Sequence, residues 1–273
     1  MDILSRTPPK ADHRLAYATT PQQFGDLWIP SGAAKKWPVV VFLHGGWWLS
    51  EFGLDYAGFL CEAMKAAGVA VWSLEYRRVG DAGGGWPGTF QDAAAGFDQL
   101  AKLAEIYPLD LGRVIAAGHS AGGHLAFWLA GRHHVPPGPL AIEPRVSLKG
   151  IVGVAAAVDL RLTIELSGYF SFSEGGPAVK RLMGGGSKDV PDRYKAGNPG
   201  ELLPLGVPQV LVQGMEDVQI PGKLPGLWAD AARRQGDHVE VKMVPEAGHF
   251  ELMDPEEKAF GFVRDAMLEL LRG

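Results

Sequence analysis

Short, nearly continuous apolar runs alternate with amphipathic segments along most of the chain. The clearest run is 38–43, P-V-V-V-F-L. A strand this apolar is typical of a parallel sheet with helices on both faces. Strands are predicted over 15–19, 24–29, 38–43, 69–74, 113–117, 148–157, 209–213 and 239–244. Helices are predicted over 56–67, 87–106, 120–131, 224–235 and 255–271. This alternation predicts an α/β fold with a doubly wound, mostly parallel sheet.

The alternation is interrupted between residues 160 and 206. This stretch contains glycine clusters at 175–176 and 184–186 and the aromatic residues Tyr169, Phe170 and Phe172. It is too long for an ordinary connection, and such insertions are usually lids or binding loops. A length of 273 residues fits one or two domains. We expect one domain over 1–273, with a lid or cap insertion at 160–206.

Charge and composition exclude several classes of partner. The formal net charge is −5 and no long run of Lys or Arg occurs, which argues against a nucleic-acid partner. No stretch of about 18 apolar residues suggests a membrane span, and residues 1–10 lack the apolar core of a signal peptide. Cys61 is the single cysteine, so no intrachain disulfide can form. We expect a cytoplasmic protein with no membrane partner.

The most informative motif is G-H-S-A-G at 118–122, between a predicted strand and a predicted helix. A serine on such a sharp turn needs small neighbours, and Gly118 and Gly122 provide them. The helix N-terminus favours developing negative charge near the hydroxyl. The motif predicts Ser120 as a nucleophile. The alternative is a small-residue turn without chemistry.

A nucleophilic serine needs a base, and the base needs an acid that orients it. His249 lies in E-A-G-H-F at 246–250, just beyond a predicted strand, where a loop can bring it to Ser120. Glu216 and Asp217 both follow the strand at 209–213. We favour Asp217, because an acid there can face the histidine loop while its neighbour faces solvent. Asp159 is the weaker alternative.

The segment H-G-G-W-W at 44–48 follows the strand at 38–43. A tetrahedral oxyanion needs two or three N–H donors aimed at one point, and glycines after a strand let the backbone turn them inward. We assign these donors to Gly46, Trp47 and Ala121. An apolar, aryl-accepting substrate pocket is predicted from four further side chains: Trp48, His119, Tyr169 and Phe250.

Two other patterns are rejected. G-G-G-W-P-G at 83–88 satisfies the spacing of a dinucleotide-binding loop, but Trp86 and Pro87 would obstruct the approach of a pyrophosphate. No histidine pair shows the spacing of a zinc-binding helix. The sequence therefore predicts no cofactor and no metal.

The order Ser120, Asp217, His249 after a histidine–glycine loop resembles the α/β-hydrolase fold along nearly the whole chain. H-G-G-W-W resembles the H-G-G-x-W motif of kynurenine formamidases and related bacterial esterases. Hormone-sensitive-lipase-like esterases instead carry H-G-G-G and commonly G-D-S-A-G, where this chain has Trp47 and His119. The resemblance implies a mostly parallel sheet of eight strands, no cofactor, and hydrolysis of short-chain esters or N-formyl amides. The lid-like insertion at 160–206, inferred from its length, follows the sixth predicted strand.

Together these features predict a serine hydrolase of the carboxylesterase type that cleaves small or short-chain acyl esters, aryl esters included. The alternative is an arylformamidase that hydrolyses N-formyl amides. A non-catalytic ligand-binding protein of the same fold is a remote alternative, because such proteins usually lose a triad member. A third alternative function is transfer of the acyl group to an alcohol instead of water. A small ester or amide substrate is the expected partner, and the sequence leaves a homodimer open.

Overall fold

A computed structural model describes residues 3–32, 35–167 and 174–272. In this part of the chain, eight strands form one sheet in the order β1-β2-β4-β3-β5-β6-β7-β8. β1 and β2 are antiparallel to their neighbours, and all other pairs are parallel. The prediction of a mostly parallel sheet of about eight strands is confirmed. The strands are β1 (His13–Ala16), β2 (Phe24–Trp28), β3 (Trp37–Leu43), β4 (Ala70–Leu74), β5 (Leu109–His119), β6 (Ile151–Val154), β7 (Gln209–Gly214) and β8 (Val239–Val244).

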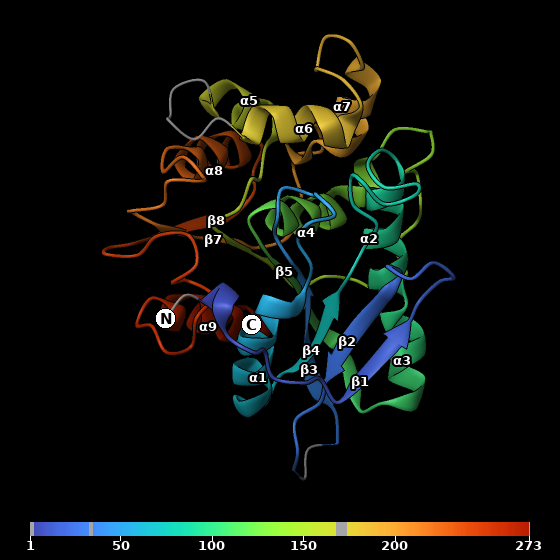
Figure 1. Ribbon diagram of the computed structural model, residues 1–273, viewed down its shortest axis with the longest axis vertical. Helices are drawn as coiled ribbons and strands as arrows, with labels where there is room; N and C mark the ends of the chain where they lie inside the picture. Colours follow the sequence, from blue (N-terminus) through green and yellow to red (C-terminus); the bar gives the residue numbers. More distant parts are fainter. Residues whose placement is uncertain (1–2, 33–34, 168–173, 273) are drawn as a thin grey trace.

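Helices cover both faces of the sheet (Figure 1). In β3, Val39 and Val41 pack into a core cluster with α2 (Gly88–Asp98), α3 (Leu100–Ile106), α4 (Ala121–Gly131) and α8 (Leu224–Arg234). Val40 and Phe42 face the other way, into a cluster with α1 (Gly58–Ala66) and α9 (Phe260–Arg272). The central strands are therefore apolar on both faces, which explains their unbroken hydrophobic runs.

The helix predicted over 87–106 is wrong in one respect, because it divides into α2 and α3 at Gln99. The indole N–H of Trp72 on β4 donates to the carbonyl of Gly96 at 2.8 Å. Arg132 donates to the carbonyl of Ala94 at 3.3 Å. Gln99 keeps helical dihedral angles and its N–H still donates to the carbonyl of Ala95, so the division is a local irregularity. The side chains that contact this part of the helix come from distant segments, which a local sequence pattern does not contain.

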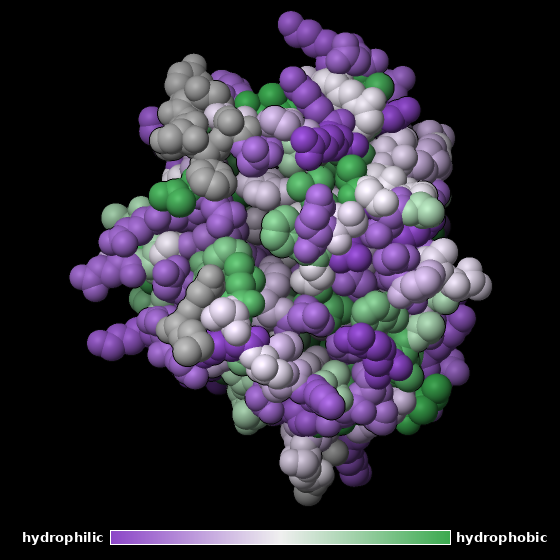
Figure 2. Space-filling view, viewed as in Figure 1, coloured by the Kyte–Doolittle hydropathy of each residue, from purple (hydrophilic) through white to green (hydrophobic). Residues whose placement is uncertain are grey.

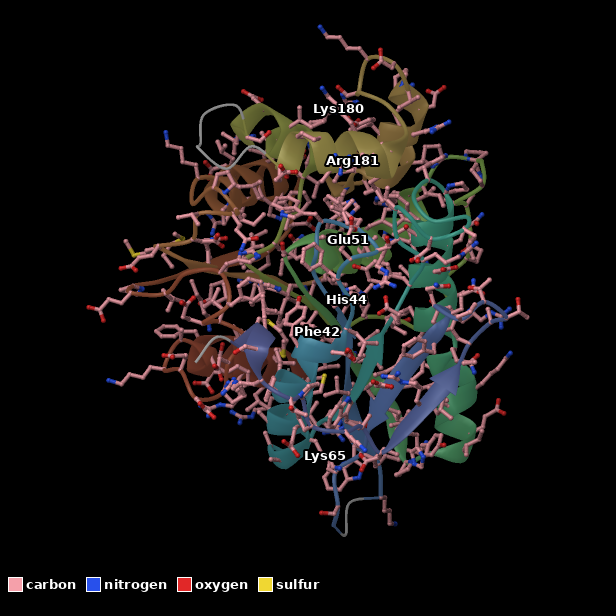
Figure 3. All side chains as sticks on the ribbon, viewed as in Figure 1. Phe42, His44, Glu51, Lys65, Lys180 and Arg181 are labelled. Atoms are coloured by element: carbon pink, nitrogen blue, oxygen red, sulfur yellow. The ribbon has the colours of Figure 1, made fainter. Side chains whose placement is uncertain are left out.

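The insertion at 160–206 lies between β6 and β7. It carries α5 (Leu160–Ser167), α6 (Gly175–Met183), α7 (Pro191–Gly197) and a short 3-10 helix (Pro199–Glu201). Figure 1 shows α5, α6 and α7 together at the top of the molecule, and Figure 3 labels Lys180 and Arg181 on α6. Among the described residues, no helix has the combined length and apolar character needed to cross a membrane. Figure 2 shows hydrophilic residues over most of this face, with small apolar patches between them.

Candidate active site

Ser120 lies on the turn between β5 and α4, with φ 55° and ψ −119°. A positive φ is uncommon for a residue with a side chain and is often found at active sites. The flanking glycines make this turn sterically possible. A Cβ on Gly118 would lie 2.2 Å from the carbonyl oxygen of Gly122, and a Cβ on Gly122 would lie 2.1 Å from that of Leu43. We call residues 118–122 the elbow.

His249 and Asp217 meet at the same edge of the sheet. Asp217 follows β7 and His249 follows β8, and these strands are parallel neighbours, so both loops leave the sheet on one side. His249 Nδ1 lies 2.8 Å from Asp217 Oδ2. A Cβ on Gly214, at the end of β7, would lie 2.3 Å from the carbonyl of Ala247, which shows how closely the histidine loop (residues 246–250) approaches.

Asp217 is held by hydrogen bonds on both carboxylate oxygens. Oδ1 accepts the N–H groups of Gln219 at 2.7 Å and Ile220 at 2.9 Å, and Oδ2 also accepts Nε2 of Gln213 at 2.9 Å. Burial alone would raise the pKa of this carboxyl group, but the bonds from His249 and the two N–H groups hold it below its ordinary value. Asp217 is therefore a charged acceptor at neutral pH.

The other two acid candidates have different environments. Glu216 is exposed. Asp159 accepts the N–H groups of Arg161 at 2.8 Å and Leu162 at 2.9 Å, at the start of α5. Burial raises the pKa of Asp159. Among these three candidates, the geometry pairs His249 with Asp217.

The histidine–glycine loop (residues 44–48) begins where β3 ends, and Figure 3 labels His44 there. The two ring nitrogens of His44 lie 2.7 Å from the carbonyl of Gly45 and 2.8 Å from Oε1 of Glu75. The next residues turn sharply, with φ 105° at Gly46 and φ 52° at Trp47. A Cβ on Gly46 would lie 2.3 Å from Phe52 Cβ, so glycine is required there.

This loop is placed beside the elbow by strand register, since Leu43 of β3 pairs with Gly118 of β5. Within the described residues, no backbone hydrogen bond uses the N–H groups of Gly46, Trp47 or Ala121. Ala121 is the first residue of α4, and a first-turn N–H has no acceptor within its own helix. These three groups can therefore donate to a ligand.

A cleft of about 740 Å³ opens beside Ser120. Its lining includes His249, Gly46 and Trp47. Two apolar side chains of the lining, Leu4 and Phe52, remain 50% and 45% exposed. An apolar cleft with a few convergent polar groups is the usual form of a small-molecule site.

The predicted pocket residues differ in their placement. His119 and Phe250 line the cleft. Trp48 does not, which corrects the prediction: it is fully buried, with its ring 5.3 Å from that of His124 and 6.2 Å from that of Trp47. A positive φ of 57° turns the Trp48 side chain into the core instead. Tyr169 falls outside the described residues.

Sequence reasoning missed two residues of the site. Tyr56 lines the cleft, and its hydroxyl accepts the N–H of Gly45 at 2.7 Å. Gln213, the last residue but one of β7, donates to Asp217. The only signal for either one was nearness in sequence to a predicted catalytic segment, and that does not specify a contact.

The sheet order, the serine on its strand–helix turn and the histidine–acid pair on later loops together define the α/β-hydrolase fold. The chain belongs to the BD-FAE family, whose sequence model matches residues 26–225.

Several known proteins are similar to this chain. Esterase LipC of Mycobacterium tuberculosis is 26% identical over 253 residues, which cover 88% of this chain and 60% of LipC. A probable mitochondrial carboxylesterase 4 of Arabidopsis thaliana is 30% identical over 141 residues, 46% of this chain and 34% of that protein. The chain thus spans between a third and two thirds of the length of these relatives.

Solved structures share the fold at low identity. Esterase B of Lactobacillus rhamnosis superposes with a TM-score of 0.82 at 20% identity, covering 98% of this chain and 89% of that one. A truncated carbohydrate esterase from gut microbiota gives 0.80 at 18% identity, covering 98% and 100%. These likenesses extend the agreement in fold over nearly the whole chain.

Proposed function

We propose that this protein is a serine hydrolase of the carboxylesterase type, which cleaves small acyl esters through an acyl-enzyme on Ser120. The observation that carries the proposal is the 2.8 Å hydrogen bond between His249 Nδ1 and Asp217 Oδ2. His249 lines the same cleft as Ser120. A serine, a base and an orienting acid in this arrangement suit nucleophilic acyl transfer.

The proton steps follow from the tautomer of His249. A charged Asp217 accepts a hydrogen bond from His249 Nδ1–H, so the proton stays on Nδ1 and Nε2 keeps a lone pair that can take the Ser120 proton. Among the described residues, Ser120 Oγ and His249 make no hydrogen bond, so the two side chains must approach one another when substrate binds. Such contacts often tighten only in the complex. Ser120 Oγ then attacks the acyl carbon.

The carbonyl oxygen becomes an oxyanion in this step. We assign its stabilisation to the N–H groups of Gly46, Trp47 and Ala121, which make no backbone hydrogen bond in the described structure. One such donor is typically worth about 3 kcal/mol of activation free energy. The N-terminus of α4 adds a favourable dipole beneath the same oxygen.

The intermediate collapses when His249 returns the proton to the leaving alcohol, and the acyl group stays on Ser120. Water then loses a proton to His249 and attacks the acyl carbon. The carboxylic acid departs as Ser120 recovers its proton, which restores the starting state.

The cleft suits a compact acyl or aryl group, because Trp47, Phe52 and Phe250 all line it. The insertion at 160–206 contributes to the cleft through Glu174, and a Cβ on Gly175 of α6 would lie 3.2 Å from the ring of Trp47. We propose that it acts as a lid over the histidine–glycine loop. The two curated relatives named above are esterases, so the arylformamidase alternative remains a prediction without added support.

The test compares Ser120→Ala with Ser73→Ala. Ser73 is equally buried, on β4, and does not line the cleft. With p-nitrophenyl butyrate, Ser120→Ala should lose at least ~10⁴-fold in kcat with an unchanged Tm, since loss of the nucleophile removes the acyl-enzyme route. Ser73→Ala should keep kcat within about twofold, because its site is remote from the chemistry. Retained turnover in Ser120→Ala would refute the proposal. N-formylkynurenine, assayed in parallel, decides between ester and formamide preference.

A further inference from the structure

Tyr56 connects parts of the site that are distant in sequence. It lies in the short 3-10 helix Asp55–Ala57, just before α1, and its ring is half-buried against the cleft. Its hydroxyl oxygen accepts the N–H of Gly45 at 2.7 Å. The same oxygen lies 2.7 Å from His119 Nδ1. One phenol group thus joins the histidine–glycine loop to the elbow.

His119 extends this chain to the histidine loop. Its Nε2 lies 3.1 Å from the backbone carbonyl oxygen of His249. The imidazole of His119 also packs against that of His249, with ring centroids 4.4 Å apart, and against Phe250 at 5.4 Å. The side chain next to the nucleophile in the elbow is therefore in direct contact with both the backbone and the ring of the proposed base.

The two ends of this hydrogen-bonded chain have fixed roles, because a backbone N–H can only donate and a backbone carbonyl can only accept. The Tyr56 oxygen therefore accepts from Gly45, and His119 Nε2 carries a proton that it donates to the His249 carbonyl. When the His119 ring is neutral, its Nδ1 is an acceptor, and the Tyr56 hydroxyl donates to it.

Burial supports the neutral state of His119. His119 is 1% exposed, and burial, followed by the proximity of His249, lowers the pKa of His119 well below its ordinary value. A neutral ring here matters for the proposed reaction, because a cation 4.4 Å away would oppose the positive charge that His249 gains in the transition state.

We propose that Tyr56 and His119 are positioning residues. Their hydrogen-bonded bridge holds the histidine–glycine loop, the elbow and His249 in the relative positions that acyl transfer requires. Gly45 immediately precedes the proposed donors Gly46 and Trp47, so its N–H bond fixes the plane from which they project. The bond to the His249 carbonyl fixes the backbone that carries the imidazole. This inference rests on the function proposed above.

The primary test is Tyr56→Phe, which removes one oxygen and keeps the ring. A misplacement of 1 Å can cost ~100-fold in rate, so we expect kcat to fall by at least ~10-fold while KM changes by less than about threefold. The matched control is Tyr194→Phe in α7. Tyr194 is buried, donates its hydroxyl to the Gly185 carbonyl at 3.1 Å, and lies outside the cleft lining. Both variants should lose similar Tm, and only Tyr56→Phe should lose kcat. Equal kcat in the two variants overturns the inference.

A double-mutant cycle tests the bridge itself. His119→Phe removes both ring nitrogens, and Tyr56→Phe breaks the same chain, so the double variant should be no slower than the slower single variant. His119→Gln keeps an acceptor and a donor, and should retain more kcat than His119→Phe. Multiplicative effects in the cycle, or equal kcat in the two His119 variants, contradict a bridge.

A second readout is independent of turnover. Nitrogen-15 spectra of histidine-labelled protein at neutral pH should show His119 protonated at Nε2 alone. A doubly protonated ring, or a proton on Nδ1, overturns the inference even if the protein is an esterase. The opposite outcome is also distinguishable. If His119 shows the expected tautomer but Ser120→Ala keeps its activity, the proposed function is wrong and the bridge is only a structural link.

Discussion

Replacing Asp217 by asparagine exchanges a single oxygen for an amide nitrogen, yet the structure predicts a large effect on catalysis. Asp217 Oδ1 accepts two backbone N–H groups, from Gln219 and Ile220. Asparagine must keep its carbonyl oxygen there, because an amide N–H₂ would face two donors. Its amide nitrogen then occupies the Oδ2 position, opposite His249 Nδ1 and Gln213 Nε2.

The magnitude follows from the proton on His249. Facing an N–H₂ donor, His249 must accept at Nδ1, so its proton moves to Nε2, and that nitrogen can no longer take the Ser120 proton. An inverted tautomer of this kind lowers kcat by ~10⁴-fold. Gln213 can adapt by rotating its amide, because its Oε1 has no partner in the described structure. The remaining cost to stability is about 1–3 kcal/mol, for the lost charge-assisted bonds.

Asp237 provides a matched control. It is buried, and it accepts the N–H groups of Leu205 at 2.8 Å and Gly206 at 2.9 Å and Nε2 of Gln209 at 2.9 Å, without a histidine. Asp217→Asn and Asp237→Asn should therefore lose similar free energy of unfolding in urea, while kcat on p-nitrophenyl butyrate falls only in the former. If Asp217→Asn keeps kcat within about tenfold of wild type, the orienting role assigned to Asp217 is wrong.

Two further predictions concern stability. Gly122→Ala should lower the free energy of unfolding by about 3 kcal/mol or more, since the new Cβ would lie 2.1 Å from a backbone carbonyl oxygen. Gly226→Ala in α8 should raise the free energy of unfolding by about 1 kcal/mol, because its Cβ would meet no atom within 4 Å and alanine favours a helix over glycine. Equal effects in urea unfolding would contradict the steric argument. Burial lowers the pKa of His124 from 6.5 to about 4, so the unfolded chain binds more protons between these values and stability falls as the pH drops through them. At 1.36 kcal/mol per pH unit, this group lowers the free energy of unfolding by about 3 kcal/mol between pH 6.5 and pH 4. In His124→Gln, the free energy of unfolding should therefore change by about 3 kcal/mol less over the same pH range. An unchanged pH dependence in the variant would refute this assignment.

Features set by local sequence could be predicted. β8 was predicted to the residue at 239–244, because its boundaries follow from its apolar pattern and flanking turns. The elbow followed from steric demand on Gly118 and Gly122, which acts within five residues. The pairing of Asp217 with His249 could be predicted because each residue follows a strand, and neighbouring parallel strands end at one edge of the sheet.

Features that depend on contacts between distant segments could not be predicted. The division between α2 and α3 is associated with the indole of Trp72, a residue on another strand. Trp48 was expected in the pocket, but its backbone turn directs it into the core beside His124. The bond between Tyr56 and His119 spans 63 positions and has no local pattern. Hydrophobic periodicity specifies which face of an element is buried, and does not specify which polar atoms meet.

The most direct measurement is the position of the covalent adduct left by a fluorophosphonate. Such a reagent reacts with an activated serine and mimics the acylation step. Intact mass spectrometry should show one equivalent bound, and peptide mapping should place it on Ser120. His249→Ala should take up no label. Labelling of Asp217→Asn should be far slower than labelling of Asp237→Asn. An adduct on another residue, or a folded protein that takes up no label, would contradict the account.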